Sequence, residues 1–167
     1  MPGRPDGIVE FTTFSEWQAF ILSFGLQPGI PHVVAVKFER ALKLHLLGWI
    51  DFDIIKAGEV VALATLELAM KDCYGLKVKD KGGKISFHRA LQYMVRQDGL
   101  RDDKLPMYHR RGGCSVVARL TGETKPSLAD IRNELAHGYP FDGLPWSGML
   151  EMVRDLIEYG YRSVIAR

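Results

Sequence analysis

Three residues with complementary chemistry lie within six positions of one another in the stretch IRNELAHGYP, residues 131–140. They are Arg132, Asn133 and His137. A guanidinium group can hold a phosphate through paired hydrogen bonds, and an imidazole gains or loses a proton near neutral pH. An asparagine amide can donate and accept hydrogen bonds at the same time. Acting together, these side chains could bind a phosphate and transfer a proton.

The flanking residues predict that this motif lies at the end of a helix. Ser127 and Asp130 are typical of a helix start, and Gly138 is the residue type most common just past a helix end. At about 100° per residue, the apolar residues of the segment converge on one stripe that should face the core. These residues are Leu128, Ile131 and Leu135. The histidine therefore belongs to the last turn of the helix.

The same geometry separates the three candidate residues. Asn133 and His137 share the face opposite the core, whereas Arg132 lies on the flank, about 140° from His137 around the helix axis. Convergence on one phosphate would need the reach of the arginine, fraying of the last turn, or a two-fold axis that joins two copies in one cleft. In the structural alternative, Arg132 pairs with Glu134 or Asp130, and the other two side chains face solvent and the helix dipole.

The composition limits the kinds of function. We expect the 167 residues to form a single domain over residues 1–167, with room for a real core. The formal net charge is only +2, so affinity for nucleic acid has to come from local patches. Cys73 and Cys114 lack the spacing of metal ligands, so we predict neither a metal site nor a cofactor. Neither a signal peptide nor a membrane-spanning stretch is evident, which predicts a cytoplasmic protein without membrane partners.

Apolar periodicity predicts an all-α protein. Residues recur at helical spacing in six segments, near 14–25, 31–49, 51–74, 86–98, 127–138 and from 145 to the end. The third segment is apolar almost all round and should be the central helix. Only residues 7–12 and 115–120 look strand-like, and two short isolated strands cannot form a substantial sheet. We expect an up-and-down bundle of about five to six helices, with residues 99–125 the least predictable part.

The arrangement of Arg132, Asn133 and His137 resembles the R-x4-H motif of the HEPN domain family. The motif lies on a late helix, as in that family, and the layout of residues 31–165 is similar to the HEPN core. Glu67, in the predicted central helix, resembles an acidic or polar position on an earlier core helix of that family. The resemblance is specific only within residues 131–138.

The resemblance implies a helical bundle that forms a homodimer and, in its active members, cleaves RNA without a metal ion. His137 would be the general acid and base, and Arg132 would stabilise charge on the phosphoryl oxygens. Asn133 would orient the histidine or hold the ribose. Such an enzyme would act as a toxin or as an antiviral or stress ribonuclease, with a cognate antitoxin or a regulatory protein as an expected partner.

The motif also resembles relatives of the mannitol operon repressor, in which an RN-x-x-AH stretch belongs to a regulatory or protein-interaction module without catalysis. Phe141, shortly after the motif, fits this group equally well. A structural helical bundle unrelated to either group is the third interpretation. The residues leave all three open.

Two short basic segments could contact an RNA backbone. The first is the turn near residues 75–85, with Lys81 and Lys84 among its four lysines. The second contains Tyr108, His109, Arg110 and Arg111. Its tyrosine could stack on a base while the cations hold phosphates. The alternative for the first segment is that its lysines keep an exposed loop soluble.

Glu67 is the most unusual polar residue of the predicted central helix, because a carboxylate is rarely buried without a partner. One interpretation pairs it with Lys71, one turn further along the same helix. In the other, Glu67 contacts Arg132 and fixes the guanidinium near the candidate site.

Overall fold

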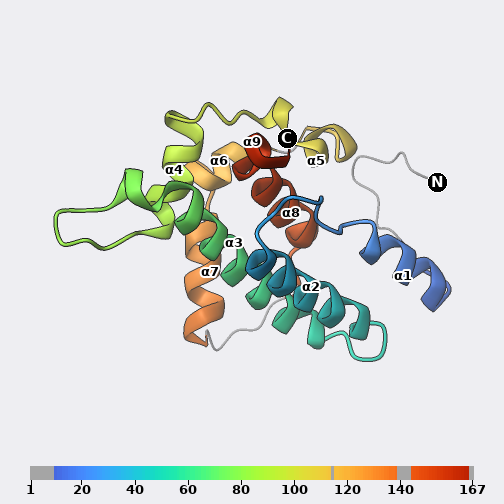
Figure 1. Cartoon of the computed structure of the whole chain (residues 1–167). Coiled ribbons are helices and arrows are strands. Elements are labelled where there is room, and N and C mark those ends of the chain that lie inside the picture. Colours follow the sequence, from blue (N-terminus) through green and yellow to red (C-terminus); the bar gives the residue numbers. More distant parts are fainter. Residues whose placement is uncertain (1–9, 114, 139–143, 166–167) are drawn as a thin grey trace.

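A long central helix, α3 (Ile54–Val78), organises the fold. The computed structural model describes residues 10–113, 115–138 and 144–165 of the chain. Helices pack against α3 on several sides: α2 (His32–Leu47), α4 (Phe87–Arg96), α7 (Leu128–His137) and α8 (Met149–Gly160) (Figure 1). This surrounding explains why α3 is apolar nearly all round and confirms it as the central helix.

Shorter helices complete the described part of the chain. They are α1 (Phe14–Leu22), α5 (Pro106–Arg110), α6 (Val116–Thr121), α9 (Arg162–Ile165) and the 3-10 helix η1 (Asp102–Lys104). No strand occurs among the described residues, so the predicted all-α class is confirmed. The nine α-helices found there exceed the expected number, because residues 99–125 and the C-terminal segment contain helices of only one or two turns.

The strand-like interpretation of residues 115–120 is wrong, because they begin α6. Ser115 caps this helix by accepting a hydrogen bond from the N–H of Ala118 (3.1 Å), and Asp102 accepts from its first two N–H groups (2.7 and 2.9 Å). These bonds satisfy donors that a helix start leaves open, and they outweigh the strand preference of two adjacent valines. The other strand-like segment, 7–12, lies partly outside the described residues, and its described part contains no strand.

Several helix boundaries differ from the predicted ones, and the largest shifts are at the end of the central helix and the start of the last long helix. The central helix continues to Val78 instead of ending near residue 74, so Lys77 lies on it, with its ammonium group 5.8 Å and 5.5 Å from the ring centres of Tyr74 and Tyr93. The last long helix begins at Met149, a turn later than residue 145. None of the described helices combines the length and the apolar character needed to cross a membrane.

The core holds α7 by one side only. Leu128 and Ile131 are buried and Leu135 is half-buried, so the predicted apolar stripe faces the core. Full burial of one such side chain contributes about 1.5–3 kcal/mol. Because this stripe anchors the helix, the opposite face of α7 is left at the surface, and Asn133 and His137 lie on it.

Candidate functional site

Capping at both ends fixes the position of α7. The Ser127 hydroxyl accepts a hydrogen bond from the N–H of Asp130 (3.1 Å), and the Asp130 carboxylate accepts one from the N–H of Ser127 (2.9 Å). This capping box satisfies two backbone donors at the helix start. Gly138 ends the helix with φ +66°, a left-handed conformation that a residue with a Cβ rarely adopts. The predicted helix start and end are both confirmed.

Arg132 reaches from α7 to α3 and pairs with Glu67. The guanidinium Nε donates to Glu67 Oε2 at 2.7 Å, and Nη2 donates to the same oxygen. Lys71 Nζ lies 2.8 Å from the other oxygen, Oε1. Both partners considered for Glu67 are therefore present, whereas Arg132 pairs with neither Glu134 nor Asp130 among the described contacts.

Opposing effects determine the ionisation of Glu67. Burial by itself would raise the pKa of this carboxyl group, but hydrogen bonds and charge from Lys71 and Arg132 lower the pKa below its ordinary value of 4.5. The carboxylate is thus ionised at neutral pH. Two cations around one carboxylate leave the group of three with a net charge of +1, which suits the binding of an anion.

Asn133 extends this network toward the surface. Its side-chain Oδ1 accepts a hydrogen bond from Nη1 of Arg132 at 2.9 Å. Three of the five guanidinium N–H donors are then used within the chain, and two make no hydrogen bond to the described residues. The amide group of Asn133 is exposed and keeps its own donors for a ligand or a second subunit.

His137 lies at the surface as the last residue of α7. Its ring makes no hydrogen bond or ion pair with any other described residue. It lies one turn after Asn133 on the same exposed face, whereas Arg132 is turned toward α3. One chain therefore displays an imidazole and an amide together, with the guanidinium anchored to one side of them.

The lysines of the first basic segment project from the molecule. The loop from residue 79 to 86, here called the lysine hairpin, is closed by hydrogen bonds from the Lys84 N–H to Asp80 Oδ1 (2.8 Å) and from the Asp80 N–H to the Lys84 carbonyl (3.1 Å). Lys81 and Lys84 are exposed. Figure 1 shows this loop extending away from the helices, beyond the C-terminal end of α3.

The second basic segment clamps α5 onto α8. Arg110 Nε donates to Glu151 Oε1 at 2.6 Å, and Arg111 Nε donates to Glu151 Oε2 at 2.7 Å. His109 Nε2 lies 2.8 Å from a backbone carbonyl oxygen, and the ring of Tyr108 packs edge-on against the imidazole. A buried carboxylate therefore neutralises much of the charge that the sequence offers to RNA.

The structure does not bring this segment to the candidate site. Figure 1 places α5 on the far side of α8 from α7. The contacts agree, because α5 packs on η1 and α8 while α7 packs on α3 and α6. RNA contact by Tyr108 to Arg111 stays a prediction. Phe141 and Cys114 lie outside the described residues.

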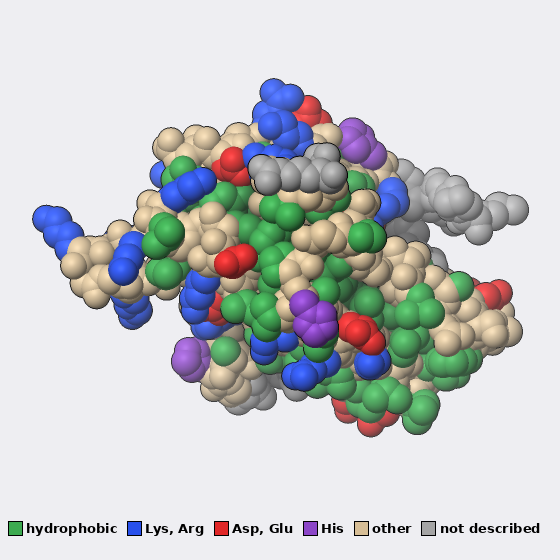
Figure 2. Space-filling model, in the orientation of Figure 1, with side chains coloured by type: hydrophobic (Ala, Val, Ile, Leu, Met, Phe, Trp, Pro, Cys, Tyr) green, Lys and Arg blue, Asp and Glu red, His purple; other side chains and the backbone are tan. Residues whose placement is uncertain are grey.

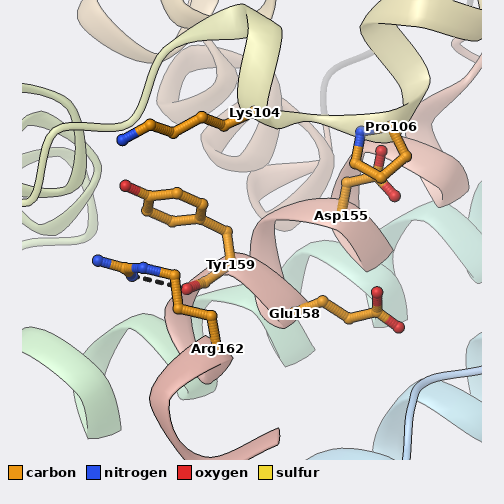
Figure 3. Close-up of a pocket in the computed structure, with 6 residues that line it drawn as sticks. All are labelled: Lys104, Pro106, Asp155, Glu158, Tyr159 and Arg162. Atoms are coloured by element: carbon orange, nitrogen blue, oxygen red, sulfur yellow. Dashed lines mark hydrogen bonds between the residues drawn. The ribbon is translucent and has the colours of Figure 1, made fainter. Parts of the chain in front are cut away.

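A groove of about 480 Å³ lies beside α8, and no sequence pattern predicted it (Figure 3). It is lined by Lys104, Pro106, Asp155, Glu158, Tyr159 and Arg162. Its cations are already engaged: Lys104 donates to a backbone carbonyl (2.7 Å), and Arg162 pairs with Asp98 (2.7 Å) and covers the Tyr159 ring at 4.0 Å. Both cations of the groove therefore take part in contacts within the chain.

Two acids of α8 have perturbed ionisation beside this groove. Burial raises the pKa of Asp155, although its carboxylate accepts a hydrogen bond from the N–H of Met107 (2.7 Å) and lies next to Arg154. Burial also raises the pKa of Glu158. Buried acids on α8 could have been expected from the sequence, because Glu151 and Asp155 lie four residues apart in an otherwise apolar stripe and needed cationic partners.

In the described part of the chain, no group of three or more His, Cys, Asp or Glu residues is arranged to hold a metal ion. The residues that remain as candidates for chemistry are Arg132, Asn133 and His137, with Glu67 and Lys71 behind them. Comparisons with protein-family models, curated proteins and solved structures found no match to this chain, so the HEPN resemblance stays a prediction that rests on these residues.

Proposed function

We propose that this chain is a metal-independent endoribonuclease of the HEPN type, in which two copies complete one active site. The observation that carries this proposal is the exposed position of the His137 ring. It is an exposed imidazole without a partner among the described residues, five residues after an arginine that a carboxylate of the central helix holds in place. A histidine positioned in this way can exchange protons with a ligand.

The proposed reaction is attack of a ribose 2′-hydroxyl on the adjacent phosphate. His137 accepts the hydroxyl proton while the new 2′-oxygen–phosphorus bond forms. The bond from phosphorus to the 5′-oxygen then breaks, and the leaving oxygen takes a proton from His137 of a second copy. The products carry a 2′,3′-cyclic phosphate and a 5′-hydroxyl, and the proton balance closes without a metal ion.

Arg132 and Asn133 would bind the reacting groups. The two guanidinium donors that remain available can stabilise the charge that develops on the phosphoryl oxygens. The exposed Asn133 amide can hold the ribose or orient the imidazole. Because Arg132 is anchored toward α3 and His137 faces solvent, convergence on one phosphate requires the second copy, which a two-fold axis near α7 supplies.

The test uses RNA cleavage in the presence of EDTA. Purified protein should cut single-stranded RNA and leave cyclic phosphate ends, and His137→Ala should slow cleavage by at least about 100-fold. His32→Ala is the matched control, because His32 is another exposed histidine on a different helix and should leave the rate unchanged. Cleavage that needs an added metal ion, or that survives in His137→Ala, would contradict the proposal.

A second candidate function is a regulatory or protein-interaction module without catalysis. It is favoured by the engagement of Arg132, since most of the guanidinium donors are already used within the chain. In this case the exposed face of α7 binds a protein, such as an antitoxin or another regulator. The complex should survive His137→Ala and fail with Asn133→Trp, while RNA stays intact under all conditions. For either function we propose a cytoplasmic setting.

A further inference from the structure

The turn between α2 and α3 is an exposed apolar surface. Residues 47–53, here called the apolar tip, include four large apolar side chains that are 41–81% exposed. They are Leu47, Trp49, Ile50 and Phe52. Phe14 of α1, itself exposed, adds to the surface by packing edge-on against Trp49. Contiguous apolar surface of this kind on a soluble protein is typical of an interaction site.

The charge of the apolar tip has one sign. Asp51 and Asp53 are its only charged residues, and both are exposed. The nearest lysines along the chain are engaged elsewhere, since Lys43 pairs with Glu39 (2.8 Å) and Lys56 lies 3.6 Å from Glu59. A negative rim of this kind repels nucleic acid and anionic lipid and favours a basic protein surface.

The other end of α3 has the complementary character. The lysine hairpin contains Lys79, Lys81 and Lys84 against one aspartate, so its net charge is +2. None of the three ammonium groups has an ion-pair partner among the described residues. Leu76, on the last turn of α3 before the hairpin, is 92% exposed. This end therefore offers an apolar side chain beside unpaired cations.

The two surfaces lie at opposite ends of one rigid element. The 25 residues of α3 separate them by about 37 Å. In Figure 1 the apolar tip is at the lower right and the lysine hairpin at the far left. Figure 2 shows the same contrast, with blue side chains at the left extremity and green ones edged with red at the lower right.

This arrangement determines which contact between copies is favourable. A two-fold contact between apolar tips would place Asp51 and Asp53 of one copy against those of the other. A head-to-tail contact places them against lysines and covers Leu76 with apolar surface. We propose that the apolar tip of one chain binds the lysine hairpin and Leu76 of a second copy, so that chains associate head to tail along α3.

The proposed contact is separate from the proposed ribonuclease site. It uses the two ends of α3 and leaves the exposed face of α7 uncovered, so a dimer formed through α7 can exist beside it. Association through a few exposed charges and a small apolar surface should be weak and sensitive to salt, because exposed charges are screened within about 10 Å at 0.1 M ionic strength.

The test uses two variants, each of which alters one of the two proposed contact surfaces. The tip variant carries Ile50→Ser and Phe52→Ser, and the hairpin variant carries Lys79→Glu, Lys81→Glu and Lys84→Glu. Since all five side chains are exposed, both variants should fold. Leu144→Ser is the matched control, because Leu144 is 83% exposed and lies in neither surface.

The measurement is molar mass by light scattering as a function of protein concentration. The wild type and Leu144→Ser should gain mass with concentration and lose it in high salt, while each variant alone should associate at least about tenfold more weakly. A mixture of the two variants should regain the association that each has lost, because the intact tip of one variant can meet the intact hairpin of the other. Carbodiimide should then link hairpin lysines to Asp51 or Asp53 between chains.

Several results would overturn the head-to-tail contact. The first is equal association of the wild type and both variants. The second is a loss of association in the tip variant with none in the hairpin variant. The third is the absence of links between the hairpin and the tip. A dimer through α7 would be common to all variants and would give no such links. The outcome is therefore independent of whether the chain cleaves RNA.

Discussion

The Glu67 carboxylate and the Arg132 guanidinium form an ion pair between α3 and α7, although 65 residues separate them in the chain. The orientation of the candidate phosphate-binding group is therefore determined by the central helix as well as by its own. Because Lys71 shares the same carboxylate, the group of Glu67, Lys71 and Arg132 has a net charge of +1. Positioning and charge at the candidate site thus depend on one residue, Glu67.

Replacement of this carboxylate should destabilise the protein measurably. Glu67→Gln leaves the half-buried guanidinium of Arg132 with a neutral acceptor, and we expect the free energy of unfolding to fall by about 1–3 kcal/mol. Lys71→Gln is the matched control on the same carboxylate. Since the Lys71 side chain is 43% exposed, its loss should change stability by less than about 1 kcal/mol. Urea unfolding measures both, and equal losses would count against a special role of the Arg132 contact.

The start of α7 provides a pH-dependent prediction. Hydrogen bonds from Ser127 and Lys125 lower the pKa of Asp130 to about 2, from an ordinary 3.8. Because the pKa is lower in the folded state, this stabilisation is present above the ordinary pKa and is lost as pH falls through the folded one. Ser127→Ala should raise the pKa of Asp130 toward 3.8. The variant should therefore lose less stability than the wild type as pH falls from the ordinary pKa to the folded one. At neutral pH the substitution should lower the free energy of unfolding by about 1 kcal/mol, because the helix cap is lost.

An NMR titration of the Asp130 carboxyl group, together with unfolding at several pH values, would measure both effects. Ser115→Ala, which removes the cap of α6, is a suitable control because it should leave the Asp130 titration unchanged. An unaltered pKa of Asp130 in Ser127→Ala would show that the capping box does not determine its ionisation.

Two glycines of α3 should respond in opposite ways to alanine. A Cβ at Gly58 would lie 2.5 Å from Nδ1 of His45, a buried ring whose Nδ1 already contacts the Ala41 carbonyl at 2.8 Å. Because α2 and α3 would have to move apart, Gly58→Ala should destabilise the protein by about 1–3 kcal/mol.

Gly75→Ala is the control in the same helix. Its Cβ would meet only the end of the Ile85 side chain, at 2.9 Å, and that end can rotate away. Alanine favours a helix over glycine by about 1 kcal/mol, so this variant should be neutral or slightly more stable. Thermal unfolding of both variants gives the comparison, and a similar loss in each would argue against close packing of α2 on α3 at Gly58.

Local sequence signals predicted the helices better than they predicted the side-chain contacts between helices. Ser127, Gly138 and the apolar stripe between them determine α7 within a few residues, so its start, end and exposed face could be predicted from the sequence. The partner of Arg132 could not be selected, because Asp130 and Glu134 are near in sequence whereas Glu67 becomes a neighbour only when α7 packs on α3. Short-range spacing cannot rank contacts that tertiary packing creates.

The second basic segment also has a partner that is distant in the sequence, in this case an acid that pairs with predicted RNA-binding cations. Arg110 and Arg111 were predicted to contact RNA because they form a local basic segment with His109, beside a tyrosine that could stack on a base. Their partner, Glu151, is 40 or 41 residues further on and becomes a neighbour through the contact between α5 and α8. Buried acids within an apolar helix were the signal for distant cations, and this signal would have located the clamp.

Removal of the clamp should weaken α5 before the rest of the fold. Glu151→Gln takes away a buried carboxylate that accepts from Arg110 at 2.6 Å and from Arg111 at 2.7 Å. Leaving two cations against a neutral group should reduce the free energy of unfolding by about 2–4 kcal/mol. Asp103→Asn is the matched control, because Asp103 pairs with an exposed arginine and water screens that pair, so its loss should change stability little.

The location of the effect distinguishes a clamp from general destabilisation. Amide hydrogen exchange in Glu151→Gln should accelerate most in α5 and least in α3, because α5 is held to α8 by these bonds while α3 is covered on several sides. In an Arg111→Gln background, Glu151→Gln should destabilise the protein less than it does alone, since part of the interaction is already missing. Uniform acceleration across all helices, or strict additivity of the two substitutions, would mean that Glu151 contributes mainly through the packing of α8.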